Sequence, residues 1–158
     1  MARQHPYIKE YLEGAYRLQA KLFDGLFIID SEVSEEDFIN KFMRSRCKEL
    51  LDHANPRLVN ATVRELYEHY YRLGGEEPLR IKEDKQQGYA PQQLYWVGMM
   101  YEYAHWYYNI PSKELIEYIP LKDMLYAYRC GHQMGEREAL EYIYKTWIKP
   151  NMDKSKNR

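Results

Sequence analysis

The amino-acid sequence predicts an all-α protein, a single-domain bundle of about six to seven helices. Apolar residues recur every three to four positions through most of the chain, which is the period of an α-helix with one buried face. The alternation of apolar and polar residues that is typical of β-strands is nearly absent. Capping residues, prolines and glycines also stand where these apolar segments begin and end.

The first predicted helix begins at Pro6 and ends at Gly25, a residue type that commonly terminates helices. Its apolar positions recur at helical spacing: Ile8, Tyr11, Leu12, Ala15, Leu18 and Leu22. The next four residues, Leu26 to Ile29, are too few to distinguish a buried strand from a further helical turn, and we favour the helix.

The second and third predicted helices each begin at a capping residue. Ser34 stands three positions before Asp37, and the helix that follows continues until Asn55–Pro56. Thr62 forms a capping box with Glu65, and the third helix ends at the glycine pair that follows its apolar face. These helices complete the N-terminal half of the predicted domain.

The chain is predicted to form one domain over residues 1–150, with two helical halves. The N-terminal half covers residues 6–75, and a charged connection over 76–91 joins it to a C-terminal half over 92–149. Residues 151–158 are polar and basic, which predicts a flexible tail.

Prolines and glycines divide the C-terminal half. They predict a helix near residues 92–108, a short one that Ser112 caps, and two more over Leu121–Cys130 and Glu136–Ile148. Pro150 is expected to end the last of these.

The composition narrows the classes of function. The 158 residues carry 23 Lys and Arg against 24 Asp and Glu, so the chain lacks the positive field that attracts nucleic acids. Cys47 and Cys130 form no CxxC pair, which indicates small core residues in a reducing compartment. The charged N-terminus is unlike a signal peptide, and no apolar run approaches the roughly 18 residues of a membrane span. We therefore expect a cytoplasmic protein with no membrane contact.

The predicted helix over residues 92–108 has apolar residues around its whole circumference. One stripe contains Leu94, Val97, Tyr101, Ala104, His105 and Tyr108, and the other positions include Trp96, Met99, Met100, Tyr103, Trp106 and Tyr107. Such a helix is covered either by its own neighbours or partly by another protein. Methionine and aromatic stripes usually fill cores, whereas tyrosine is enriched in interfaces. Seventeen tyrosines are more than a core of this size can readily hydrogen-bond, which favours a partner for some of them.

Catalytic signals are weak. The nucleophile, zinc and phosphate-binding motifs GxSxG, HExxH, GxxxxGK[ST] and GxGxxG are absent. Glu102 and His105 share a helical face, and Cys130 and His132 lie two positions apart, yet no third group completes either pair. A small helical enzyme around Glu102, His105 and His132 is therefore the third hypothesis, after the two below, and no cofactor or metal is expected.

A DNA-binding regulator is the second hypothesis. The two short helices within residues 112–130 have the lengths of a helix-turn-helix. The second of them presents Lys122 and Arg129 among Met124, Leu125, Tyr126 and Tyr128, which is a poor surface for reading bases. Nucleic-acid binding is therefore not favoured.

Residues 95–142 carry two linked motifs, W-[IV]-G-x-x-Y-x-Y-x-x-W and N-I-[PS]-S-x-x-L-x-x-x-[IL]-P. The matching residues are Trp96, Val97, Gly98, Tyr101, Tyr103, Trp106, Asn109, Ile110, Pro111, Ser112, Leu115, Ile119 and Pro120. In this stretch the chain resembles small bacterial helical proteins encoded beside ADP-ribosyltransferase-like toxins. The resemblance implies an antitoxin or companion role and carries no catalytic motif.

The leading hypothesis is a non-enzymatic, protein-binding module that neutralises a cognate toxin in a toxin–antitoxin or phage-defence system. Aromatic anchors would occlude the toxin's substrate cleft, and the segment 76–91 would order on contact. A homo-oligomer is also compatible with the sequence. The predicted partner-binding residues are Trp96, Met100, Tyr103, Trp106, Tyr107 and Tyr108.

Overall fold

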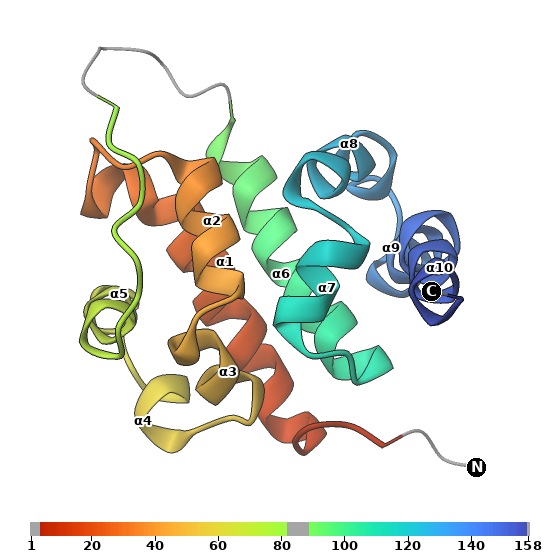
Figure 1. Cartoon of the computed structure of the whole chain (residues 1–158), viewed down its shortest axis with the longest axis horizontal. Coiled ribbons are helices and arrows are strands. Elements are labelled where there is room, and N and C mark those ends of the chain that lie inside the picture. Colours follow the sequence, from red (N-terminus) through yellow and green to blue (C-terminus); the bar gives the residue numbers. More distant parts are fainter. Residues whose placement is uncertain (1–3, 82–88, 158) are drawn as a thin grey trace.

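The computed structural model describes residues 4–81 and 89–157, and its named elements in these ranges are all helical (Figure 1). The predicted all-α class is confirmed. A single antiparallel bridge between Val33 and Arg80 is the β pairing found in the described ranges. Within the same ranges, no helix has the length and apolarity needed to cross a membrane.

A short 3-10 turn, η1 (Lys9–Tyr11), leads into α1 (Leu12–Ile29), so the predicted helix start at Pro6 was wrong. The predicted end at Gly25 was wrong, because α1 continues until Asp30 takes an extended conformation with φ of −153°. A glycine inside a helix costs only about 1 kcal/mol, which the buried residues Leu22, Phe23 and Leu26 outweigh. The helical interpretation of the apolar run after Gly25 is confirmed.

Four helices follow: α2 (Glu35–Met43), α3 (Arg46–Asp52), α4 (Pro56–Val59) and α5 (Val63–Arg72). The single helix predicted after Ser34 is divided, because the Ser45 hydroxyl accepts a hydrogen bond from the Lys48 amide at 3.1 Å and starts α3. The expected six to seven helices were therefore too few. The capping box of Thr62 and Glu65 is present at the start of α5.

The C-terminal elements are α6 (Pro91–Tyr108), α7 (Ser112–Tyr118), α8 (Leu121–Gly131), α9 (Glu136–Ile143), the π-helical turn η2 (Tyr144–Ile148) and α10 (Lys149–Lys156). The predicted helix end at Pro150 and the flexible tail from residue 151 were wrong, since α10 runs through both. In η2 the Lys149 amide donates to the Tyr144 carbonyl, and this wide turn makes room for the proline ring. Asn151 Nδ2 also donates to the Tyr118 carbonyl at 2.6 Å, which holds α10 against α7.

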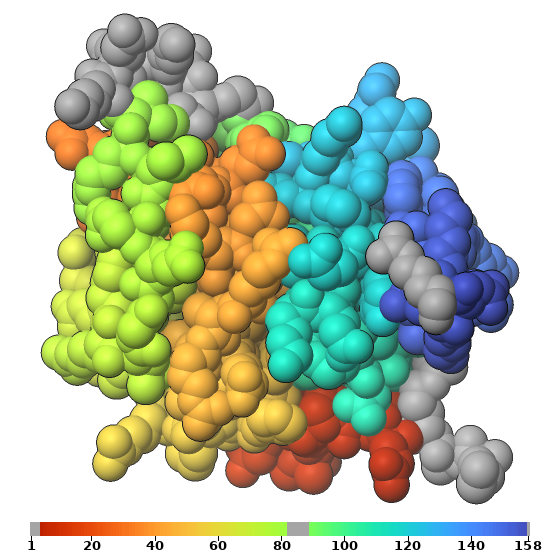
Figure 2. Space-filling view, viewed as in Figure 1, coloured from red at the N-terminus to blue at the C-terminus, as the bar shows by residue number. Residues whose placement is uncertain are grey.

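The helices α1 and α6 lie side by side through the middle of the molecule (Figure 1). Gln19 Nε2 in α1 donates to the Gly98 carbonyl in α6 at 2.8 Å, and both residues are buried. In the view of Figure 2, residues of the N-terminal half occupy one side of the surface and α7 to α10 the other. The α1–α6 pair therefore joins the two halves of the sequence.

The charged connection predicted over residues 76–91 lies partly outside the described residues, at 82–88. Its first part is held to the turn before α2, because the Ser34 amide donates to the Leu79 carbonyl at 2.8 Å. The Leu79 amide in turn donates to Asp37 Oδ2 at 2.7 Å. This part of the connection thus has defined partners on the N-terminal half.

Glu35, in the first turn of α2, is 5% exposed, and burial raises the pKa of its carboxyl from 4.5 to about 7. The folded state therefore retains this proton more tightly than the unfolded chain. Stability from this source is fully present below pH 4.5 and is lost as the pH rises through about 7. With allowance for solvent screening, we expect the free energy of unfolding to fall by about 2 kcal/mol between pH 5 and pH 8.

Urea unfolding of the wild type and of Glu35→Gln at several pH values measures this loss. The neutral amide does not titrate, so the variant should lack this part of the pH dependence. Identical profiles for the two proteins would contradict the assignment to Glu35.

Candidate functional site

Three of the six predicted partner-binding residues lie inside the protein. Trp96 is 8% exposed, Met100 is 0% exposed and Trp106 is 6% exposed. The prediction that these three residues are surface anchors was wrong, because other parts of the same chain cover each of them. The periodicity of α6 shows that the helix is covered, but it does not show what covers it.

The cover over Trp106 is the N-terminal segment of the chain. The His5 ring stacks on the Trp106 ring with centroids 3.7 Å apart, and His5 Nδ1 lies 2.9 Å from the Trp106 carbonyl. Trp106 Nε1 donates to the Tyr7 carbonyl at 2.8 Å. The indole N–H of Trp106 is therefore already hydrogen-bonded within its own chain. A tryptophan that anchors an interface usually donates this N–H to the partner protein instead.

The other three predicted residues, Tyr103, Tyr107 and Tyr108, are half-buried at the end of α6. Tyr108 stacks on Tyr144 with centroids 4.1 Å apart, and Tyr107 packs edge-on against Tyr103 with centroids 6.4 Å apart. Arg137 Nη2 donates to the Tyr107 hydroxyl at 2.7 Å. These tyrosines keep part of their surface exposed to solvent between α6 and the α9–η2 segment.

A second aromatic group, absent from the prediction, lies on α8, α9 and η2. It consists of Tyr126, Arg129, Tyr142 and Trp147, and we call it the α8–η2 cluster. The Trp147 ring lies edge-on to Tyr142 and to Tyr126, with centroids 5.5 Å and 6.4 Å apart. Tyr126 is 58% exposed, and the Arg129 guanidinium carbon lies 5.5 Å from its ring centroid. The sequence signal that could have predicted this cluster is the spacing of Tyr126 and Arg129. Residues three positions apart on one helix share a face.

The proposed DNA-reading segment forms α7 and α8, as predicted. The exposed side chains of α8 are Lys122, Tyr126, Arg129 and Cys130, so the structure also corrects the expectation that Cys130 is a core residue. Arg129 lies over an aromatic ring rather than extending freely. This face resembles a protein-binding surface more than a base-reading one.

A buried polar network joins α3, α6 and the N-terminal segment. Lys48 is fully buried, and its ammonium group is bonded to Glu102 and lies 2.9 Å from Asp52 Oδ1. The Tyr7 hydroxyl donates to the other oxygen of Glu102 at 2.7 Å. Burial favours the neutral amine, but the attraction of Asp52 and Glu102 is stronger and raises the pKa of Lys48. Burial together with the Glu102 carboxylate raises the pKa of Tyr7, so its phenol stays protonated.

His105 and Ser112 complete this network around Asp52. His105 Nδ1 lies 2.6 Å from the Ile110 carbonyl, and Nε2 lies 3.1 Å from the Asp52 carbonyl. The His105 ring therefore lies between main-chain oxygens of two different segments. Ser112 donates its hydroxyl to Asp52 Oδ1 at 2.6 Å and its amide to Oδ2 at 2.9 Å. Lys48 thus lies between two buried carboxylates, Asp52 and Glu102.

The surrounding groups explain the titration of Asp52. Burial alone would raise the pKa of this carboxyl, but Lys48, His105 and the Ser112 hydroxyl together hold it below the usual range. The carboxylate therefore stays charged while its acceptor positions are filled. These groups fix the geometry where α3 meets α6 and α7.

The structure separates the residues of the enzyme hypothesis. Glu102 and His105 are buried and bonded to other groups, as described above, rather than to each other. His132 is exposed, where its ring stacks on Tyr128 with centroids 4.3 Å apart and its Nδ1 lies 2.6 Å from the Tyr128 carbonyl. Within residues 4–81 and 89–157, no group of three His, Cys, Asp or Glu side chains is placed to hold a metal ion.

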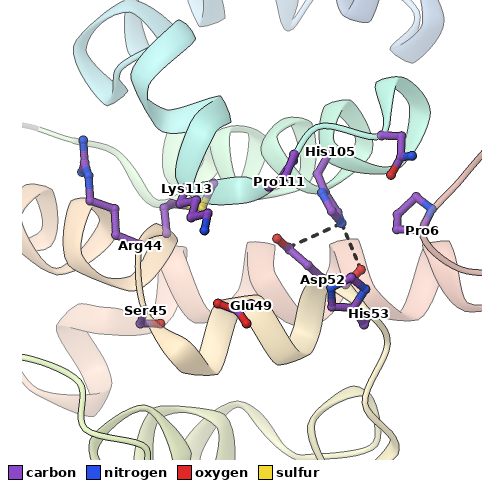
Figure 3. Close-up of a pocket in the computed structure, with 11 residues that line it drawn as sticks. Pro6, Arg44, Ser45, Glu49, Asp52, His53, His105, Pro111 and Lys113 are labelled. Carbon is purple, nitrogen blue, oxygen red and sulfur yellow. Dashed lines mark hydrogen bonds and ion pairs between the residues drawn. The ribbon is translucent and has the colours of Figure 1, made fainter.

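A cavity of about 420 Å³ lies over this polar network, between α2–α3 and the start of α7 (Figure 3). Asp52 and His105 are among its lining residues, and the dashed lines in Figure 3 mark the contacts between these two. Neither was predicted as part of a cavity, because Asp52 on α3 and His105 on α6 are far apart in the sequence.

Comparisons of the chain with protein-family models, with curated proteins and with solved structures return no match. Two features of the described residues offer binding surfaces: the exposed aromatic side chains of the C-terminal half and the cavity above the polar network.

Proposed function

We propose that this protein is a non-enzymatic binding module that neutralises a bacterial toxin of the ADP-ribosyltransferase type. The observation that carries the protein-binding part is the α8–η2 cluster, in which a largely exposed tyrosine, an arginine and a tryptophan lie together on the surface. The antitoxin part is supported by the resemblance of residues 95–142 to proteins encoded beside such toxins.

The chemistry of the α8–η2 cluster suits a protein partner. Trp, Tyr and Arg are the residue types most enriched at energetically important interface positions. Trp and Tyr bury a large area and lose few rotamers, and Arg adds a charged planar group. The rings of Tyr126, Tyr142 and Trp147 already pack on one another, so a partner would not need to order them. Arg129 adds a charged group that can form paired hydrogen bonds with a partner carboxylate.

Tyr103, Tyr107 and Tyr108 extend the proposed binding surface to the end of α6. Their half-buried rings have the amphipathic character that interfaces favour. In this proposal Trp96, Met100 and Trp106 support the surface from beneath and do not contact the partner. Occlusion of the toxin's substrate cleft is the mechanism that needs no catalytic group in this chain.

Tyr126→Ala should weaken partner binding without unfolding the protein. An exposed side chain contributes little to folding, so we expect the melting temperature to stay within a few degrees. Loss of an interface anchor should raise the Kd by roughly thirtyfold, or about 2 kcal/mol. Affinity capture from the native host, followed by calorimetry with the partner identified, measures this change.

Tyr11→Ala is the matched control, because Tyr11 is 50% exposed and lies on η1, outside the cluster. It should leave the Kd unchanged. Equal Kd values for Tyr126→Ala and the wild type would exclude the α8–η2 cluster as the interface. A captured partner that is not toxic, or whose toxicity persists on co-expression, would exclude the antitoxin role.

A further inference from the structure

The cavity above the polar network is large enough for a small molecule. Its volume of about 420 Å³ lies in the range of small-ligand sites. Figure 3 shows Arg44 and Lys113 toward one end of the cavity and His53 and Pro6 toward the other, with Asp52 and His105 between them. The walls therefore combine charged groups with apolar surface from prolines and Met43.

The polar groups at the floor of the cavity already have partners within the protein. The Asp52 carboxylate accepts hydrogen bonds from the Ser112 amide and hydroxyl and is paired with Lys48. Both nitrogens of His105 face carbonyl oxygens. A positively charged ligand would have to displace groups that are already well bonded, which is costly for buried charges.

The walls, in contrast, contain one cation that no described carboxylate pairs. Glu49 is paired with Arg46 at 2.5 Å, and Arg44 with Glu117 at 2.6 Å. Lys113 lines the cavity without an ion-pair partner among the described residues, and its side chain is exposed. The exposed His53 ring also lines the cavity. Lys113 is therefore the charged wall residue with hydrogen-bond donors available to a ligand.

We propose that this cavity binds a small ligand carrying a compact oxyanion, either a carboxylate or a phosphate group. Lys113 supplies the charge, and Arg44 can turn one side of its guanidinium to the same anion. The Arg44–Glu117 pair is exposed on both sides, so sharing the guanidinium costs little. The rest of the ligand lies along α3 toward His53. This site is separate from the α8–η2 cluster and does not depend on the toxin partner.

Titration of the full chain with inorganic phosphate and with succinate, against sodium chloride of the same ionic strength, tests the site. Binding to the folded state raises the melting temperature saturably, and amide NMR shifts locate the bound anion. We expect one or both anions to shift residues of α3 and the start of α7. A response to phosphate alone or to succinate alone identifies which oxyanion the site takes.

Lys113→Met should weaken the binding by about tenfold, because it removes the unpaired charge. Its own melting temperature should stay close to that of the wild type, since the side chain is exposed. Lys122→Met is the matched control, because Lys122 is an exposed lysine on α8 that does not line the cavity. No saturable shift with either anion, or an equal loss of affinity in both variants, would overturn the proposal.

Discussion

Lys48→Met should lower the free energy of unfolding by about 3–5 kcal/mol, the largest single effect that we expect in this protein. The substitution preserves the apolar stem of the side chain and removes a charge that pairs with both Asp52 and Glu102. Asp52 and Glu102, both buried, would then lose the cation that they share. A typical domain is stable by only about 5–15 kcal/mol, so the variant should be close to unfolding at room temperature. Urea denaturation followed by circular dichroism measures the loss.

The double variant Lys48→Met with Glu102→Met shows whether unpaired charge is the cause. It removes one cation and one carboxylate, so it should be more stable than Lys48→Met alone. Arg17→Met is the exposed control: its partner Glu13 lies 2.6 Å away, and both side chains are more than half exposed. That change should cost less than about 1 kcal/mol. A similarly small loss in Lys48→Met would contradict the role given to the network.

The polar network also predicts sensitivity to acid. The pKa of Asp52 is held below its usual range, so its contribution to stability is present above about pH 4 and is lost as the pH falls through the folded-state pKa. Glu35 acts in the opposite direction, since its pKa is raised to about 7. Between these two effects, stability should be greatest in mildly acidic solution.

Some helix boundaries follow from local sequence signals, whereas others depend on tertiary packing. A start such as Thr62–Glu65 depends on side chains that bond to nearby backbone amides, and the structure has this box. The predicted ends at Gly25 and Pro150 were wrong for different reasons. Burial of the neighbouring residues carries α1 through Gly25, and a π-helical turn accommodates Pro150. Both depend on tertiary packing or backbone geometry that the local sequence does not contain.

The candidate sites were harder to predict because they combine distant residues. Sequence identified α6 as apolar, but the cover over Trp106 comes from His5 and Tyr7, about one hundred positions away. Glu102 and His105 share a face of α6, as predicted, but they bond to groups on α3, in the N-terminal segment and after α6 rather than to each other. Nothing in the local pattern distinguishes Lys48, which is fully buried, from the exposed lysines nearby.

The two proposed binding features differ in how they relate to the core. In the α8–η2 cluster, Tyr126 and Arg129 are exposed, so they can change at little cost to the core, whereas Tyr142 and Trp147 also pack against it. The cavity, in contrast, has the Lys48–Asp52 network as its floor, so damage to that network should also deform the cavity. Anion binding in the Lys48 variants would therefore report on fold rather than on recognition. The Lys113 and Lys122 pair avoids this difficulty.

Gly98→Ala should destabilise the protein by about 2–3 kcal/mol, the second large effect that we expect. A Cβ atom at this position would lie 2.8 Å from Ala20 Cα and 3.0 Å from the Gln19 carbonyl oxygen, both backbone atoms of α1. Neither atom can move without shifting the whole helix. The buried hydrogen bond from Gln19 to the Gly98 carbonyl would also be strained.

Helix propensity alone predicts the opposite sign, because alanine inside a helix is favoured over glycine by about 1 kcal/mol. Gly25→Ala isolates that contribution, since Gly25 lies inside α1 and, apart from its own helix, no atom of the described residues lies within 4 Å of the place that a Cβ would take. This control should therefore stabilise the protein by about 0.5–1 kcal/mol. Chemical denaturation of both variants gives two shifts of opposite sign if the α1–α6 contact is as close as described. Stabilisation by both substitutions would mean that the two helices can separate at little cost, and that the N-terminal and C-terminal halves are joined elsewhere.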